Sequence, residues 1–281
     1  MPSKPCTQPQ LVALGPIMTM TTRTSARHIG GRIAASSAVV VALLANACPA
    51  AAADISLLSA AAMQSVFRQI AGDFQRTSGH RLVIRYATMG AITQRILGGE
   101  SADLVIGSGQ SISRLIKEGR IRALQIVCRT GVGIVAVSGT PKPPMTSVAD
   151  FRRALIAANV IVYADPGGGG AAGIHIANVI EKLALTEQLK PKTRFGAGGD
   201  VTELTLAQGQ GALGITQISE IVGKSGADYV GPLPDDLQNY TEVVAAIPVD
   251  ARELEAVRAF LVFLQSPAAI AAIKAKGMEV D

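Results

Sequence analysis

The spacing of hydrophobic residues predicts short strands that alternate with helices from about residue 55 onward. β-branched or apolar runs at 55–59, 81–86 and 103–108 are typical of strands, and the segments that follow them are helical in pattern. The first helix carries apolar residues three or four positions apart and ends at a glycine: Met63, Val66, Phe67, Ile70, Phe74 and Gly79. Strands alternating with helices favour an α/β fold built from parallel βαβ units.

The same alternation begins again at a strand over residues 131–137. Ser147, with Asp150 three residues later, resembles a capping box, and Asp200 with Glu203 repeats the pattern. Two successive α/β units predict two lobes, with an extended segment near Tyr240 returning the chain to the first. The predicted lobes are 54–129 plus 240–281, and 130–239.

Composition and charge narrow the function classes. Of the 281 residues 48% are apolar, which predicts a large aliphatic core. The formal charge is +5, but residues 1–53 hold four basic and no acidic residues, which leaves 22 basic and 21 acidic residues in the remainder. A nearly neutral chain without basic blocks gives nucleic-acid binding little electrostatic support, so we expect no nucleic-acid partner.

The first 53 residues have the layout of a secretory signal peptide. A positive segment at 22–32 precedes 15 apolar residues at 33–47, and Cys48–Asp54 offers a cleavage site after Ala53. A start at Met18 or Met20 gives a signal of more usual length. A membrane anchor would need about 20 apolar residues, and a lipoprotein attached through Cys48 fits poorly with Asn46. We therefore predict export to the periplasm.

Catalytic and metal-binding patterns are absent from the sequence. After cleavage Cys128 is the remaining cysteine, which excludes an intramolecular disulfide and leaves a buried residue or a reactive thiol as interpretations. No His/Cys cluster and no nucleophile-elbow motif occur. We expect no enzyme activity, no cofactor and no metal.

The stretch ADPGGGGAAG at 164–173 stands between a predicted strand and a predicted helix. Glycines let backbone approach an anion closely, and the N–H groups at Ala172 and Gly173 would face it at a helix N-terminus. A permissive loop without a ligand is the alternative. No Lys-Ser/Thr follows, so the stretch is not a phosphate-binding P-loop.

Other strand–helix junctions supply further candidate contacts. Thr88 could donate to an anion or cap a helix, and Gly90 permits close approach. Arg129, where the lobes meet, could bind a carboxylate or be solvated. Four further residues could each contact the ligand or serve only in packing: Ser59, Arg85, His175 and Gln217.

Several fragments resemble the periplasmic molybdate-binding family of solute-binding proteins across nearly all of residues 54–281. They are ISLLSAAAMQSVFRQIAGDF, ATMGAITQRILGGESADLVIGS, YADPGGGGAAGIHIANVIEKLAL, GALGITQISEI, VGPLPDDLQNYTEVVAAI and AFLVFLQSPAAIAAIKAKGME. The resemblance implies the type II periplasmic-binding-protein fold, an α/β fold of two lobes with two crossovers. It also implies a small anionic ligand in the cleft and delivery to an inner-membrane ABC permease. We expect a monomer.

The family's oxyanion-binding positions correspond to Ala62, to Met89 or Gly90 beside Thr88, and to Ala172, Val201 and Gln217. The family's serine and tyrosine hydroxyls are replaced here by Ala62 and Gln217. Each lost charge-assisted hydrogen bond costs about 1.5–3 kcal/mol. The ligand is therefore either a molybdate- or tungstate-like oxyanion, or a small organic carboxylate held by Arg129, Gln217 and Thr88. A ligand sensor that docks on a membrane receptor without transport is the alternative function.

Overall fold

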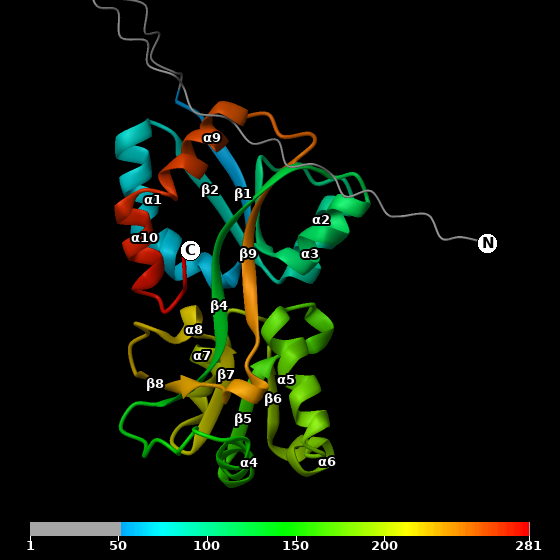
Figure 1. Cartoon of the computed structure of the whole chain (residues 1–281), viewed down its shortest axis with the longest axis vertical. Coiled ribbons are helices and arrows are strands. Elements are labelled where there is room, and N and C mark those ends of the chain that lie inside the picture. The colour runs from blue at the N-terminus through cyan, green and yellow to red at the C-terminus, as the bar shows by residue number, and fades with distance from the viewer. Residues whose placement is uncertain (1–51, 281) are drawn as a thin grey trace, which may run out of the picture. The chain divides into compact units, whose positions relative to one another are not determined.

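The computed structural model describes residues 52–280, and residues 1–51 of the predicted signal peptide lie outside that range. The described strands form a continuous sheet in the order β2-β1-β3-β9-β4-β7-β5-β6, with β8 paired to β4 off this path (Figure 1). The strands are β1 Asp54–Ala60, β2 Arg81–Ala87, β3 Leu104–Ser108, β4 Ile121–Val137, β5 Val160–Ala164, β6 Thr193–Gly196, β7 Ala212–Gln217, β8 Ala227–Pro232 and β9 Tyr240–Pro248.

Helices connect these strands and confirm the predicted alternation. The α-helices are α1 Gln64–Ser78, α2 Met89–Leu97, α3 Gly109–Lys117, α4 Val148–Ala157, α5 Ala171–Lys182, α6 Thr186–Leu189, α7 Val201–Gln208, α8 Ile218–Ile221, α9 Leu254–Phe263 and α10 Pro267–Lys274. Short 3₁₀ turns are η1 Ala61–Met63, η2 Pro166–Gly168, η3 Lys190–Lys192 and η4 Asp235–Leu237. The fold is the α/β fold that the sequence predicts.

The sheet has two halves that share strand β4. Sheet A contains β2, β1, β3, β9 and the first part of β4, and sheet B contains the last part of β4 with β7, β8, β5 and β6. On β4, Gly131 is the last residue paired with β9 and Val132 the first paired with β7. The strand predicted at 131–137 is therefore the end of a longer one, since pairing with β9 extends it back to Ile121.

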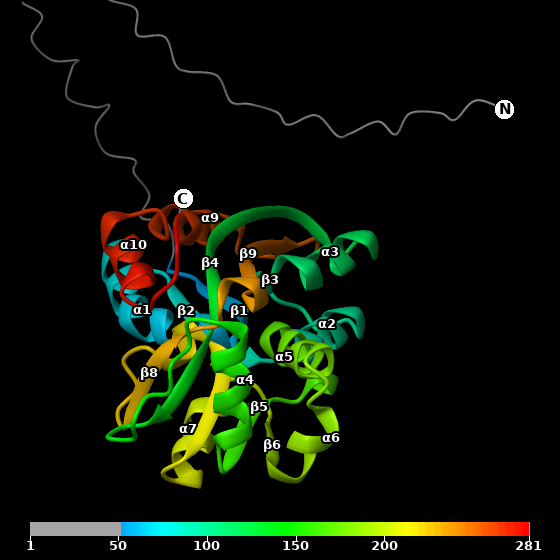
Figure 2. The ribbon, with the colours of Figure 1, turned by 60° about the horizontal axis from the view of Figure 1, so that its bottom comes forward.

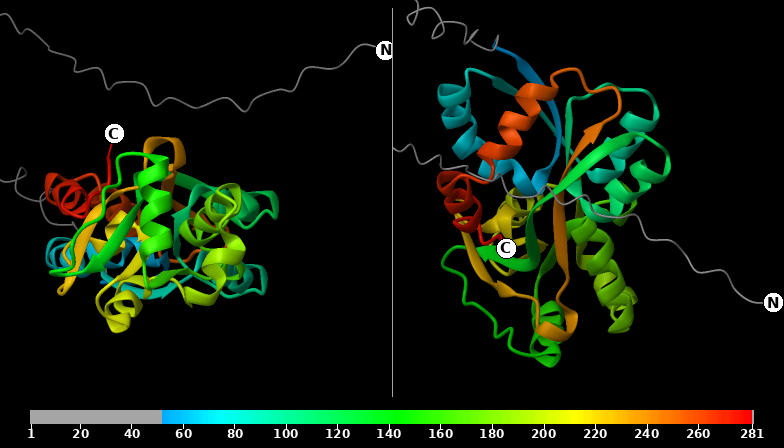
Figure 3. Two further views of the ribbon diagram at one scale, coloured as in Figure 1. Left: turned by 90° about the horizontal axis from the view of Figure 1, so that it is seen from below. Right: turned by 45° about the horizontal axis from the view of Figure 1, so that its top comes forward.

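Each half of the sheet has its own hydrophobic core. Helices α1, α9 and α10 pack on one face of sheet A, and α2 and α3 cover the other (Figures 2 and 3). Helices α4 and α5 pack on one face of sheet B, with α7 opposite. None of the buried clusters in the described residues combines strands from both sheets. Each core is therefore confined to one half of the sheet.

Local signals set most helix ends. Helix α1 ends at Gly79, whose φ of 77° is left-handed, as predicted. The Ser147 hydroxyl accepts from the Asp150 N–H, which confirms that cap. Asp200 occupies the predicted N-cap position of α7, but its side chain makes no capping hydrogen bond to the helix. Its carboxylate accepts from the N–H groups of Ala197 and Gly198 in the preceding loop, because these donors face back from the turn.

Within residues 52–280 no single helix is long and apolar enough to cross a membrane. Helices α9 and α10 pass such a test only as a pair, and they are bent by 66° at the break between them. Their apolar side chains, including Phe260 and Ile273, are buried against sheet A. Packing in the core accounts for their hydrophobicity.

Buried Asp103 ties the start of β1 to helix α9, and we predict that Asp103→Ala destabilises the protein strongly. Its carboxylate accepts from the N–H groups of Ser56, Arg252 and Glu253 at 2.9–3.1 Å. Unpaired buried donors each cost about 1–3 kcal/mol. Urea unfolding should show a loss of about 2–4 kcal/mol.

The matched control for this substitution is Asp73→Ala. Asp73 is exposed and forms an i,i+3 ion pair with Arg76, so its removal should change the unfolding free energy by less than about 0.5 kcal/mol. Equal effects of the two substitutions would contradict the structural role of Asp103.

Candidate ligand-binding site

A pocket lies between the halves, where strands of both sheets end. In α/β sheets, ligands bind beyond the carboxyl ends of the strands. The cavity has a volume of about 70 Å³, which is below the range of about 300–1,000 Å³ for drug-sized ligands. Its lining residues are Ala60, Ala61, Ala62, Ala87, Thr88, Met89, Gly107, Ser108, Ala164, Gly170, Ala171, Ala172, Gly173, Gly198, Gly199, Thr216, Gln217, Glu220, Thr241 and Val243.

Helix N-termini from both halves open onto this pocket. The first intrahelical bond of α5 runs from the Ile174 N–H to the Gly170 carbonyl, so the N–H groups of residues 171–173 lie ahead of it. In α2 the first such bond runs from Ile92 to Thr88, which leaves the N–H groups of residues 89 and 90. N–H groups ahead of the first bond give a helix N-terminus a partial positive charge. The pocket therefore favours a negative charge.

The glycine stretch allows the two halves to approach at backbone distance. A Cβ at Gly90 would lie 2.6 Å from the carbonyl oxygen of Gly168, and one at Gly169 would lie 2.8 Å from the Gly90 Cα. Gly169 also has a left-handed φ of 73°. A second contact of this kind joins Gly199 to Ala61, where an added Cβ would lie 2.5 Å from the alanine Cβ. Glycine is required here for contact between the halves.

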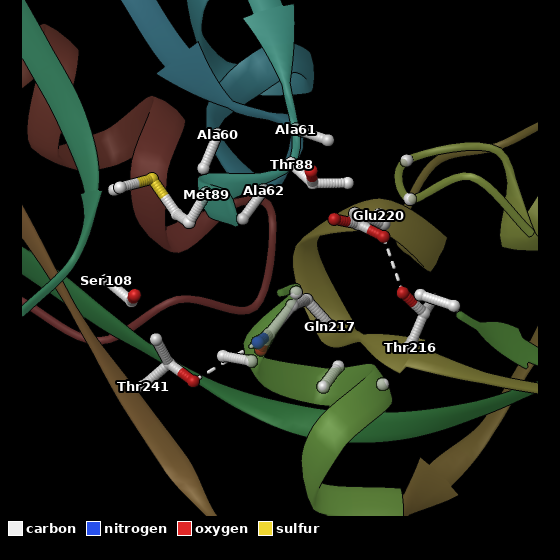
Figure 4. Close-up of a pocket in the computed structure, with 18 of the residues that line it drawn as sticks. Ala60, Ala61, Ala62, Thr88, Met89, Ser108, Thr216, Gln217, Glu220 and Thr241 are labelled. Atoms are coloured by element: carbon white, nitrogen blue, oxygen red, sulfur yellow. Dashed lines mark hydrogen bonds between the residues drawn. The ribbon is translucent and has the colours of Figure 1, made fainter. Parts of the chain in front are cut away.

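Polar side chains in the pocket are few. Gln217 is 6% exposed, and its Nε2 donates to the Thr241 hydroxyl at 3.2 Å (Figure 4). Its Oε1 is buried and has no hydrogen-bond partner among the described residues. Turning the amide over would exchange these atoms, so either orientation leaves one polar atom for a ligand. The Thr88 hydroxyl accepts a hydrogen bond from the Ala91 N–H and so caps α2, which confirms the helix-cap interpretation of Thr88.

Glu220 is the ionisable side chain among the residues that line the pocket. The Thr216 hydroxyl donates to its carboxylate Oε2 (Figure 4). Burial raises the pKa of Glu220 to about 7, against the lowering effect of the Thr216 hydrogen bond. The sequence contained a signal for it. Gln217 ends a strand as a helix N-cap, so the side chain three residues later lies on the first turn, beside the same cleft.

The pocket brings together six of the ten residues proposed from the sequence: Ala62, Thr88, Met89, Ala172, Gly173 and Gln217. Four others lie outside its lining. Ser59 is buried and donates to the Ala60 carbonyl, Val201 is buried in a core cluster, and Gly90 contacts the glycine stretch. Arg129 pairs with Glu279 at 2.5 Å and lies over the Tyr240 ring.

The remaining titratable candidates have structural partners. Arg85 pairs with Glu100, and His175 Nε2 lies 2.7 Å from the Leu237 carbonyl oxygen. Cys128 is buried, and burial raises the pKa of its thiol to about 12, so it is a packing residue and not a thiolate nucleophile. Among residues 52–280, no group of three or more His, Cys, Asp or Glu side chains is placed to hold a metal ion.

Comparison with known proteins agrees with this geometry. A family model described as bacterial extracellular solute-binding protein matches residues 55–279. An aconitate isomerase from Pseudomonas sp. is 28% identical over 234 residues, covering 80% of this chain and 87% of that protein. The molybdate-binding protein ModA from Azotobacter vinelandii is 27% identical over 251 residues, 86% of this chain and 96% of that protein.

Solved structures show the same fold. The periplasmic molybdate-binding protein of Azotobacter vinelandii superimposes with a TM-score of 0.68 at 18% identity, over 81% of this chain and 99% of that one. The fold is thus that of the type II periplasmic binding proteins, as the sequence resemblance implied.

We predict that Gly90→Ala weakens ligand binding without unfolding the protein. The added Cβ would collide with the Gly168 carbonyl, so the halves must separate by a few tenths of an ångström or more. The N–H groups of α2 and α5 would then no longer reach one ligand together. Calorimetry should show a loss of at least about tenfold in affinity, equal to about 1.4 kcal/mol.

Gly72→Ala is the matched control. Its Cβ would meet only the end of the flexible Arg76 side chain at 3.6 Å, inside helix α1. Alanine is favoured there by about 0.5–1 kcal/mol, so stability should rise and affinity should stay constant. Unchanged affinity in Gly90→Ala would show that the glycine contact is not needed for binding.

Proposed function

The chain belongs to the family of bacterial extracellular solute-binding proteins, and we propose that it captures a small organic carboxylate between its two lobes. The observation that carries this proposal is the convergence of helix N-termini from both halves on one pocket. The protein would act in the periplasm as a monomer, deliver its ligand to an ABC permease, and catalyse no reaction. The permease would recognise the closed, ligand-bound conformation of the protein.

The charge pattern supports an anion held by backbone groups. None of the pocket's lining residues is Lys, Arg or His, so N–H groups and hydroxyls supply the donors. Hydrogen bonds from amides at helix ends suffice to bind anions when water is excluded. Arg114 lines the hollow outside the glycine stretch, where its charge favours the approach of an anion.

The apolar wall of the pocket favours a ligand with a carbon skeleton. Seven alanines with Met89 and Val243 line it, and a bare tetrahedral oxyanion would leave much of this surface unused. Position 62 lacks a hydroxyl, and position 217 supplies an amide, which can accept as well as donate. The relative named aconitate isomerase acts, by its name, on a tricarboxylate. A molybdate- or tungstate-like oxyanion stays the alternative ligand, supported by the ModA relatives.

Hinge closure is supported by the two connecting strands. Residues 54–129 with 240–281 would form one lobe and 130–239 the other, because β4 changes partner between Gly131 and Val132. The separate cores let the lobes rotate as bodies. The contact between Gly90 and Gly168 would then form on closure.

A calorimetric panel tests the ligand class. We predict micromolar or tighter binding of a di- or tricarboxylate such as trans-aconitate, citrate or tricarballylate, and binding of molybdate, tungstate and sulfate at least about tenfold weaker. Gln217→Ala should weaken the carboxylate by about 1–2 kcal/mol, because it removes a buried hydrogen-bonding group. Nanomolar molybdate binding with no carboxylate binding would overturn the assignment.

Isomerisation of an unsaturated carboxylate is a second candidate function, favoured by Glu220. A 1,3-proton shift needs a base that removes a proton from one carbon and returns it to another, and a carboxyl with a pKa near 7 suits both steps. Glu220 lines the pocket and is held by Thr216. The relative named aconitate isomerase supports the same chemistry.

Proton NMR separates the two functions. If the protein only binds, cis- and trans-aconitate incubated with it in D₂O will keep their spectra, without isomerisation or deuterium incorporation beyond the protein-free rate. Catalysed exchange that disappears in Glu220→Gln but persists in Glu181→Gln, an exposed carboxylate on α5, would instead establish the isomerase.

A further inference from the structure

We propose that ligand capture places one proton between Glu220 and the bound anion, so that the protein takes up a proton when it binds a fully ionised ligand. This inference rests on the proposed function, since it concerns the same pocket. It goes beyond that function by making Glu220 a specificity-determining residue and by coupling binding to pH.

The position of Glu220 carries the argument. Its carboxyl faces the pocket from α8, opposite Thr88 and the η1 turn (Figure 4). One oxygen, Oε2, accepts from the Thr216 hydroxyl. An anion held by the N–H groups of α2 and α5 would therefore lie in the same small space as this carboxyl. Two negative charges in a site that excludes water repel each other strongly, and a shared proton removes that repulsion.

The charged groups around Glu220 do not offset a second negative charge. Asp200 and Glu203, from the start of α7, raise its pKa, and Lys224 lowers it. Lys224 is itself ion-paired with Glu203. Three other neighbouring segments also carry charged or titratable groups. Arg68 of α1 lines a small hollow together with Glu220. Strand β8, which contacts α8, carries Asp228 and Tyr229, and Lys276 lies near Gly223.

Protonated Glu220 also completes the hydrogen bonding of the site. Its O–H would donate to a ligand oxygen, while the Thr216 hydroxyl donates to the other carboxyl oxygen. The proton comes from solvent, or from the ligand when the ligand carries one. The site would then select a ligand that presents a hydrogen-bond acceptor to α8 and an anionic group to α2 and α5.

The direction of the pH dependence follows from linkage. The pKa of Glu220 in the free protein is raised to about 7, and a nearby anion raises it further. Below pH 7 the carboxyl is already protonated, so affinity is constant. Above pH 7 each binding event takes up a proton, and affinity falls by up to tenfold for each pH unit until the pKa of the complex is reached.

Calorimetry in two buffers measures this uptake directly. Trans-aconitate and, separately, molybdate would be titrated at pH 8.0 in HEPES and in Tris, whose ionisation enthalpies differ, and again at pH 6.0, 7.0 and 8.5. For the probe that binds, we expect uptake approaching one proton at pH 8.0 and a fall in affinity of about tenfold between pH 7.0 and 8.5. Equal heats in the two buffers with a flat pH profile would overturn the inference and leave the proposed function intact.

Two variants identify the group. Glu220→Gln should bind with no proton uptake and a flat pH profile, with an affinity at pH 8.0 at least equal to that of the unaltered protein. Glu181→Gln, at the exposed far end of α5, should keep the uptake. Uptake that persists in Glu220→Gln would overturn the assignment. If Glu220→Gln fails to fold, the two-buffer titration of the unaltered protein still decides whether a proton is taken up. Absence of binding by both probes at every pH would contradict the proposed function itself.

Discussion

The meeting of helix N-termini across the cleft is the constraint on which the other features depend. The N–H groups of α2 come from one half and those of α5 from the other, and no Lys, Arg or His lines the pocket. Backbone donors cannot extend toward a ligand as a lysine can, so the halves themselves must come close. Gly90, Gly169 and Gly199 provide this closeness, because a Cβ at any of them would collide with the facing half.

Two consequences follow for selectivity. A site made of backbone groups does not distinguish anions by charge alone, so its side chains must do so. Gln217 is buried with one polar atom unpaired, and Glu220 is the titratable group that faces the same space. The Gln217 amide, the Glu220 carboxyl and the alanine-rich wall offer a ligand different contacts from those of a site lined by hydroxyl donors. The fold is shared with relatives that are named for oxyanions, whereas these side chains are where specificity can diverge.

The sequence predicted the fold far better than the detail of the pocket. Periodicity located the helix at Gln64–Ser78 and the Ser147 cap because these depend on neighbouring residues. It located only the last part of β4, since the pairing of residues 121–131 with β9 joins segments more than a hundred residues apart. The close approach of Gly90 to Gly168 likewise could not be predicted from the sequence, because the two residues are far apart in the chain. Glu220 was missed because its importance comes from burial, which a single sequence does not display.

The order of strands in sheet A has a consequence for how the chain matures. Strand β9 lies between β3 and β4, yet it is the last strand to be synthesised. Until it arrives, the inner edges of β3 and β4 stay unpaired, and the first core lacks its two closing helices, α9 and α10. A nascent chain therefore cannot complete this half early, whereas sheet B's own strands β5 to β8 are contiguous. Late insertion of the central strand β9 therefore keeps sheet A incomplete until the final segment is available.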